Sequence, residues 1–341
     1  MPDINHRARK ILQAVVQEFI ATGDAVGSRT ITKRYGLELS PATVRNVMAD
    51  LEETGLLTQP HTSAGRVPTD AGLRYFVDTL LKVRSLSAKE KEEIAARYQV
   101  TALEFDDLMK ETSKLLSELS QHTALVFAPR ADSNVFEHIE FMRLRESELL
   151  AVLVTKAGKV VNKIIPLDKP LSDPELDRIH NYLNSLLEGL TLEEVRAKVV
   201  EEIGRTKNQY DQLVARALAL GAQALEGVGR PDVIIEGQAN LLDKQHDPEK
   251  LRTLLKALEE KQQMLALLDR TLEAPGIQVF IGAETNLAPL RDMSVVAASY
   301  GPEDRPLGTL GVIGPQRMNY SRVISLVDFT AHLLSDVLNR M

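Results

Sequence analysis

Within the first 85 residues the apolar period changes from helical to strand-like after Gly55 and back to helical at Thr69, and this pattern constrains the fold more than any other feature of the chain. Before Gly55 the apolar residues recur at helical spacing in three segments, at positions 11–20, 28–35 and 41–54. Residues 56–68 instead form two short strand-like segments around a small polar turn. A further helix is predicted over Thr69–Val83. Helix, short helix, helix and two-stranded hairpin is the order of a winged helix-turn-helix, which we therefore predict for residues 1–86.

In a helix-turn-helix the second helix of the pair enters the major groove of DNA. Here that helix is Ser40–Thr54, which starts with serine at the N-cap and Pro41 in the first turn. Its outer, N-terminal side carries Ala42, Thr43, Arg45 and Asn46. Arginine can bind guanine through two hydrogen bonds, asparagine can bind adenine in the same way, and the methyl groups of Ala and Thr can touch the thymine methyl. Ser40 and the helix N-terminus can also hold a phosphate.

Further candidate DNA contacts lie on the first helix of the pair and beside the polar turn of the hairpin. They are Ser28, the expected N-cap, with Arg29, and His61, Ser63 and Arg66. Additional phosphate contacts are expected from basic residues of the first two helices, namely Arg7, Arg9, Lys10, Lys33 and Arg34. The same helix order also occurs in protein-interaction modules, in which Arg45 and Asn46 would simply face solvent. The pattern of residues alone leaves both interpretations open.

The net charge of the whole chain, −7 with an isoelectric point of about 5.6, argues against nucleic acid as a partner. The charge is unevenly distributed, however. Residues 1–84 hold 11 Lys and Arg against 9 Asp and Glu, a net of +2, whereas the remaining residues hold 30 against 39, a net of −9. Such an asymmetry is typical of a nucleic-acid-binding end attached to an acidic body.

Several classes of protein are excluded or disfavoured by the sequence. The chain has no cysteine, which excludes disulfides, thiolate metal sites and cysteine nucleophiles. Its seven histidines form no pair at metal-ligand spacing, and nucleotide-binding and serine-hydrolase motifs are missing. We therefore expect neither an enzyme nor a metal or other cofactor. The longest apolar run, Leu149–Val154, cannot span a membrane, and the first residues lack a signal-peptide core. We expect a cytoplasmic protein.

The remainder of the chain alternates between helical and strand periods, as expected for an α+β multidomain protein. Residues 135–166 resemble a three-strand meander, and residues 172–229 carry only helix signals. A single long helix is predicted over Pro248–Leu272, followed by three strands and a final helix over Ser321–Asn339. The segment Gly311–Tyr320 is distinctive, and is interpreted either as a rigid connection or as a ligand or partner site.

Five segments together resemble the heat-inducible transcription repressor family, HrcA. The N-terminal ones are T-G-D-A-V-G-S-R-T from Thr22 and S-P-A-T-V-R-N-V-M from Ser40, with P-H-T-S-A-G-R-V-P-T from Pro60. The C-terminal ones are V-F-I-G-A-E from Val279 and G-V-I-G-P-Q-R-M-N-Y from Gly311. The resemblance extends over essentially the whole chain.

The resemblance implies a dimeric repressor of chaperone operons, acting on double-stranded DNA at the nucleoid. Members of the family bind an inverted-repeat operator, CIRCE, through winged-helix domains, and the chaperonin maintains their activity until heat shock. It further implies a GAF-like α/β domain with an antiparallel sheet, over residues 87–131 and 231–341, interrupted by an inserted α+β dimerisation domain over 132–230. The alternative is a winged-helix regulator that responds to a small molecule bound in the GAF-like domain.

Overall fold

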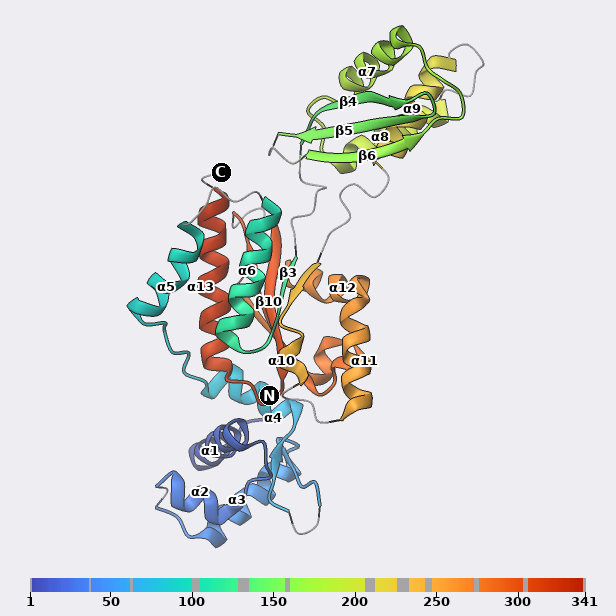
Figure 1. The fold of residues 1–341 in the computed structure, drawn as a ribbon. Coiled ribbons are helices and arrows are strands. Elements are labelled where there is room, and N and C mark those ends of the chain that lie inside the picture. The colour runs from blue at the N-terminus through green and yellow to red at the C-terminus, as the bar shows by residue number, and fades with distance from the viewer. Residues whose placement is uncertain are drawn as a thin grey trace. The chain divides into compact units, whose positions relative to one another are not determined.

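The computed structural model describes residues 2–36, 38–61, 64–99, 105–127, 135–156, 160–205, 212–225, 233–242, 247–272, 276–302 and 306–339. The chain divides into two compact units (Figure 1). Unit 1 joins Met1–Phe127 to Val233–Met341, and unit 2 is Ala128–Asp232. Unit 1 therefore combines two stretches of sequence that unit 2 separates. Across the described ranges, no helix has the length and apolar character needed to cross a membrane.

Unit 1 begins with a mainly helical segment, residues 6–80, which we call the arm. Its helices are α1 (His6–Thr22), α2 (Ser28–Arg34), α3 (Pro41–Glu53) and α4 (Asp70–Tyr75). Between α3 and α4 lies an antiparallel pair of short strands, β1 (Leu57–Thr58) and β2 (Val67–Pro68). The helix predicted to reach Val83 ends earlier, because α4 continues into a single π-helical segment, η1 (Phe76–Leu80), after which Leu81 is extended. The N-cap of α2 is Gly27 rather than Ser28, which is the first residue of the helix.

The rest of unit 1, which we call the body, is built on one five-stranded antiparallel sheet in the order β7-β3-β10-β9-β8. The strands are β3 (Thr123–Phe127), β7 (Val233–Glu236), β8 (Ile277–Ile281), β9 (Met293–Tyr300) and β10 (Gly308–Pro315). The helices of the body are α5 (Ala88–Gln99), α6 (Phe105–Ser120), α10 (Ala239–Leu242), α11 (Pro248–Glu259), α12 (Lys261–Leu272) and α13 (Tyr320–Leu338). Two short 3₁₀ segments, η3 (Gly282–Thr285) and η4 (Ala288–Leu290), lead from β8 to β9.

Both faces of this sheet are buried. Along β9, Val296 and Ala298 belong to the core beneath α6 and α13, whereas Val295 and Ala297 belong to the core beneath α11 and α12. Successive side chains of a strand point to opposite faces, so a strand buried on both sides is apolar throughout. This explains why β9 shows a continuous apolar run rather than alternation. The arm shares the first of these two cores.

The prediction of one long helix over Pro248–Leu272 is wrong, because the structure contains two helices that meet at Glu260. A straight helix of that length would extend about 37 Å, whereas an eight-residue strand extends only about 26 Å. Leu258 of α11 and Leu268 of α12 both enter the core on the same sheet face. The residues at the break are polar and include neither glycine nor proline, and therefore carry no local signal for it.

Unit 2 is an antiparallel meander with helices on one face. Its strands are β4 (Phe136–Arg145), β5 (Glu148–Thr155) and β6 (Val160–Pro166), and its helices are α7 (Asp173–Leu187), α8 (Leu192–Arg205) and α9 (Gln212–Leu225). Leu149, Ala151 and Leu153 of β5 point toward the helices and are buried. The alternate residues of β5 are only half-buried, so the second face of this sheet is left open among the described residues.

Candidate nucleic-acid interface

The N-terminal turn of α3 presents the residues predicted to contact bases. The Ser40 side chain accepts a hydrogen bond from the Thr43 amide at 3.1 Å, and Pro41 occupies the first turn, so the predicted cap is confirmed. Val44, Met48 and Leu51 are buried in the arm's core. The helix period then turns the intervening residues outward, and these are Ala42, Arg45 and Asn46, all exposed, with Thr43 half-buried.

The exposed cations of this surface have no protein partner in the described part of the chain. Arg45 of α3 and Arg29 and Lys33 of α2 are exposed, and the structure records no hydrogen bond or ion pair for their side chains. The contacts between α2 and α3 place the three residues on neighbouring helices of one compact arm. A guanidinium or ammonium group without a protein partner is available to phosphate and base acceptors.

Two other arginines, Arg34 and Arg9, are paired with carboxylates. Arg34 lies 2.5 Å from the buried carboxylate of Glu18, and Arg9 forms an ion pair with Asp3. The Glu18 hydrogen bond raises the pKa of Arg34. Arg34, predicted as a phosphate contact, is thus engaged in joining α2 to α1.

Arg66, a predicted contact of the hairpin, also has partners within the arm. Its guanidinium lies 2.8 Å from Glu52 of α3, and its side chain is only 15% exposed. Its backbone exchanges two hydrogen bonds of 2.9 Å with Val26. The preceding residue must be glycine, since a Cβ on Gly65 would lie 2.4 Å from the Val26 backbone. Arg66 therefore fastens the hairpin to α3 and to the loop after α1.

The remaining predicted contacts occupy different environments. Ser28 is buried, with 8% of its surface exposed, and its carbonyl accepts a hydrogen bond from the Thr32 hydroxyl. His61 is exposed in the turn of the hairpin, where its carbonyl accepts from the Ala64 amide at 2.8 Å. Ser63 lies outside the described residues. The accessible surface of the arm thus carries Ser40, Arg29, Arg45 and Asn46. Ser28 and Arg66 instead make contacts within the arm.

A polar junction that sequence reasoning missed joins the arm to the body. Arg74 of α4 binds both carboxylate oxygens of Glu284 in η3, one of them at 2.9 Å, and also donates to the Val279 carbonyl. One turn earlier, the Asp70 carboxylate accepts from the Gln316 amide at 2.8 Å and from the Ala283 backbone amide at 3.0 Å. We call Asp70, Arg74, Glu284 and Gln316 the clasp.

The electrostatics of the clasp favour its charged form. Burial of Glu284 favours the neutral acid, but the hydrogen bond from Arg74, the Ile281 amide and the charge of Arg74 outweigh it and lower the pKa of Glu284. Burial opposes the charge of Arg74, yet its carboxylate partners raise the pKa of that guanidinium. Gly282, which adopts a φ of +54°, allows Asp70 to approach, since a Cβ there would lie 2.2 Å from the Asp70 carboxylate.

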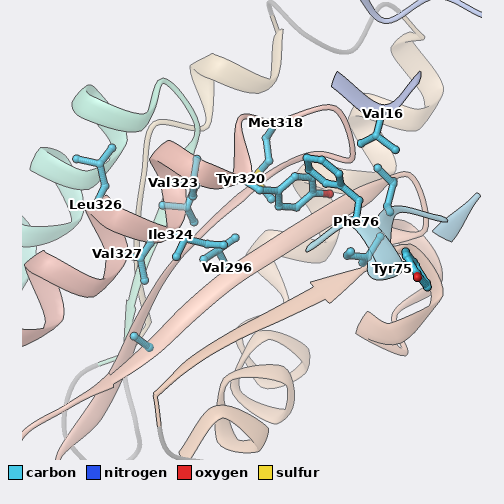
Figure 2. Close-up of a cluster of buried hydrophobic side chains, with 14 of the residues drawn as sticks. Val16, Tyr75, Phe76, Val296, Met318, Tyr320, Val323, Ile324, Leu326 and Val327 are labelled. Atoms are coloured by element: carbon cyan, nitrogen blue, oxygen red, sulfur yellow. The ribbon is translucent and has the colours of Figure 1, made fainter. Parts of the chain in front are cut away.

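Apolar side chains of the arm and the body also share a buried cluster. Val16 of α1 and Phe76 of η1 belong to the same buried cluster as Met318 and Tyr320 of the body (Figure 2). The Tyr320 hydroxyl donates to the Gln316 carbonyl at 2.9 Å, and burial raises the pKa of this phenol. Both predicted C-terminal signature segments, residues 279–284 and 311–320, thus hold the arm on the body. Of the two interpretations of Gly311–Tyr320, the rigid connection accounts for Gln316, Met318 and Tyr320.

Comparison with known proteins assigns the chain to a family. Residues 106–324 match the model described as the HrcA protein C terminal domain. The chain belongs to the HrcA family. Its curated relatives include the heat-inducible transcription repressors HrcA of Geobacter sulfurreducens, 48% identical over 99% of both chains, and of Sorangium cellulosum, 46% identical over 99% of both. The names of these HrcA relatives are those of regulators and not of enzymes.

A solved structure shares the fold of this HrcA chain over its full length. It is the crystal structure of a hypothetical protein at 2.2 Å resolution, which is 26% identical, has a TM-score of 0.60, and is matched over 98% of its own length and 99% of this chain. The α+β architecture with antiparallel sheets is therefore common to both proteins.

Proposed function

We propose that this protein represses class I heat-shock, or chaperone, operons by binding the inverted-repeat operator CIRCE. The observation that carries the proposal is the exposed N-terminal face of α3, on which Arg45 and Asn46 have no recorded side-chain partner among the described residues. These two residue types are those that recognise guanine and adenine in the major groove. The relatives named heat-inducible transcription repressors support the assignment.

We assign domains to the chain on the same basis. Residues 1–86 form a winged-helix DNA-binding domain, in which β1 and β2 are the wing. Residues 87–131 and 231–341 form a GAF-like domain around the five-stranded sheet. Residues 132–230 form an inserted dimerisation domain. A repressor built in this way acts in the cytoplasm on nucleoid DNA.

The open sheet face of unit 2 supports a dimer. Met142, Leu150 and Ile164 stand opposite one another across β4, β5 and β6, so their side chains lie on one face. Met142 is 53% exposed and Ile164 58% exposed, and Val160 on the same strand is 60% exposed. Large apolar residues gathered on one exposed face mark a protein interface. We propose that two copies of this face meet, because a two-fold dimer matches the two-fold symmetry of an inverted repeat.

The dimer interface is tested with Ile164→Asp, which introduces a charge at the centre of the proposed contact. We expect this variant to sediment as a monomer. Val200→Asp is the matched control, because Val200 is also apolar and exposed, 68%, but lies on α8. We expect Val200→Asp to remain dimeric, and a monomeric Val200→Asp with a dimeric Ile164→Asp would move the interface to the helical side.

The chaperonin is the proposed partner that keeps the repressor active. A partner that binds the active form raises its population by mass action, and the population falls when unfolded proteins occupy that partner.

The function is tested by fluorescence anisotropy with a duplex carrying the inverted repeat of a chaperone promoter and a scrambled duplex of equal length. We expect binding to the inverted repeat to be about 10³-fold tighter, and to increase with chaperonin. Equal affinity for the two duplexes contradicts the proposal.

A further inference from the structure

A cleft lies between the arm and the body beside the clasp, and the DNA-binding proposal makes no use of it. Its volume is about 750 Å³, and one wall is formed by α1 with Gln13, Gln17 and Ile20. The opposite wall is the loop that enters α13, with Arg317, Asn319 and Ser321. This volume is within the range of about 300–1,000 Å³ that is typical of small-molecule sites.

The charges that line the cleft are of one sign. Lys82 and Arg317 contribute an ammonium and a guanidinium group, and no aspartate or glutamate is among the described lining residues. Neither side chain has a recorded hydrogen bond or ion pair within the described chain, although Arg317 is half-buried. Among the described residues, the other half-buried arginines, Arg66, Arg74 and Arg216, are each paired with a glutamate. An anion in the cleft would provide the missing partner.

The other lining residues define the rest of the ligand. Gln13, Gln17 and Asn319 supply amide donors, whereas Ile20, Leu80 and Leu81 supply apolar surface. Inorganic anions would leave this apolar surface unused, and neutral apolar compounds would leave both cations unpaired. We propose that the cleft binds a small organic anion with an apolar body, whose acidic group lies between Lys82 and Arg317.

The location of the cleft gives such a ligand a regulatory role. Because Gln13 and Ile20 belong to the arm and Arg317 and Asn319 to the body, one bound molecule would join the two. It would therefore stabilise the docked position of the arm that carries α3. This consequence rests on the proposed DNA-binding function, whereas the binding of the anion does not. If the anion changes the affinity for DNA, DNA must change the affinity for the anion by the same factor.

A structural role for Arg317 alone is the competing explanation. The Arg317 guanidinium lies over Gly23, the C-cap of α1, where a Cβ would be only 2.5 Å from Nη1. The last turn of α1 has no basic residue of its own, and a cation there interacts favourably with the helix dipole. This role involves Arg317 but does not involve Lys82 or Ala21, which also lines the cleft.

The proposal is tested with 8-anilinonaphthalene-1-sulfonate, an apolar anion whose fluorescence reports binding, and the full-length protein. We expect saturable binding of the probe, displaced by decanoate but not by decanol or inorganic phosphate. Lys82→Gln removes a charge from the cleft, and Ala21→Trp fills the cleft. Each should weaken the binding of the probe about tenfold or more. Arg252→Gln, an exposed cation on α11, is the matched control and should bind the probe normally.

The outcomes separate the explanations. Unchanged probe affinity in Lys82→Gln and Ala21→Trp overturns the proposal. If Arg317→Gln then lowers the thermal midpoint, Arg317 serves only as a cap of α1. Displacement of the probe by decanol as readily as by decanoate also overturns it. Arg45→Ala should bind the probe like the wild type, so failure of the DNA-binding proposal cannot be mistaken for failure of this one.

Discussion

The two ends of the arm use arginine in opposite ways. At the tip, Arg45 and Arg29 are exposed and have no recorded partner among the described residues. At the base, Arg74 binds Glu284, Asp78 and a backbone carbonyl, and only 24% of its side chain is exposed. The same residue type therefore stabilises the fold at one end and is exposed without a recorded partner at the other. The partner, rather than the residue type, decides the role.

This contrast also accounts for the acidic body. Charges farther from the DNA than about 8–10 Å are largely screened at physiological salt. The −9 net charge of residues 85–341 therefore need not oppose binding by the N-terminal segment, residues 1–84, whose net charge is +2. What matters is the set of cations on the arm without carboxylate partners.

The largest effect on stability is expected for Arg74→Ala. The substitution removes the Arg74 donor from the half-buried Glu284, which keeps only the Ile281 amide, and from the Val279 carbonyl, which we expect to cost about 2 kcal/mol after allowance for partial exposure. Scanning calorimetry of the full chain should show a lower midpoint for the arm and body. Arg45→Ala is the control and should leave the midpoint unchanged, because it removes no recorded contact. Equal thermal midpoints for Arg74→Ala and Arg45→Ala would contradict the claim that only the arginine at the base of the arm contributes to stability.

A smaller effect is expected from acid. The folded-state pKa of Glu284 lies below its ordinary value, so its ion pair stabilises the protein at neutral pH and is lost as the pH falls through the glutamate range. The midpoint difference between the wild type and Glu284→Gln should therefore shrink between pH of about 6 and about 3.5. Glu53→Gln, at an exposed position on α3, should show no such convergence. A difference that stays constant with pH would mean that the charge of Glu284 contributes nothing.

The smallest effects are expected at the cations of the tip that we propose to contact phosphates. Arg29→Ala and Lys33→Ala should each weaken binding to all DNA sequences alike. Each should also reduce the slope of log affinity against log salt by about 0.9, since one fewer phosphate is neutralised. A salt titration by anisotropy measures the slope, with Arg252→Ala as the control on α11. Arg34→Ala, which breaks the pair with Glu18, should instead lower stability.

The parts of the structure that the sequence predicted are local in origin. Ser40, Pro41 and the apolar period of α3 act within one helix, so they fixed its start and its outward face correctly. Three strands of unit 2 and most helices followed from the same kind of pattern.

The parts that the sequence could not predict depend on contacts between distant residues. Arg74 and Glu284 are 210 positions apart, and neither residue carries a local signal that names its partner. Arg66 and Glu52 are closer in sequence, but their pairing depends on how the hairpin folds back onto α3. The break at Glu260 likewise carries no local signal, although residues of both α11 and α12 enter one core. The segments containing Glu284 and Gln316 were recognisable as family signatures, yet their function as a clasp required the fold.

The most direct test of the central claim, that the tip of the arm recognises DNA sequence, compares Arg45→Ala with the wild type on two duplexes. Removal of a bidentate base contact should cost about 1–3 kcal/mol on the inverted-repeat operator and far less on scrambled DNA of equal length. Arg252→Ala should change neither affinity. An equal loss on both duplexes, or no loss on either, would contradict the assignment of α3 as the helix that recognises the operator.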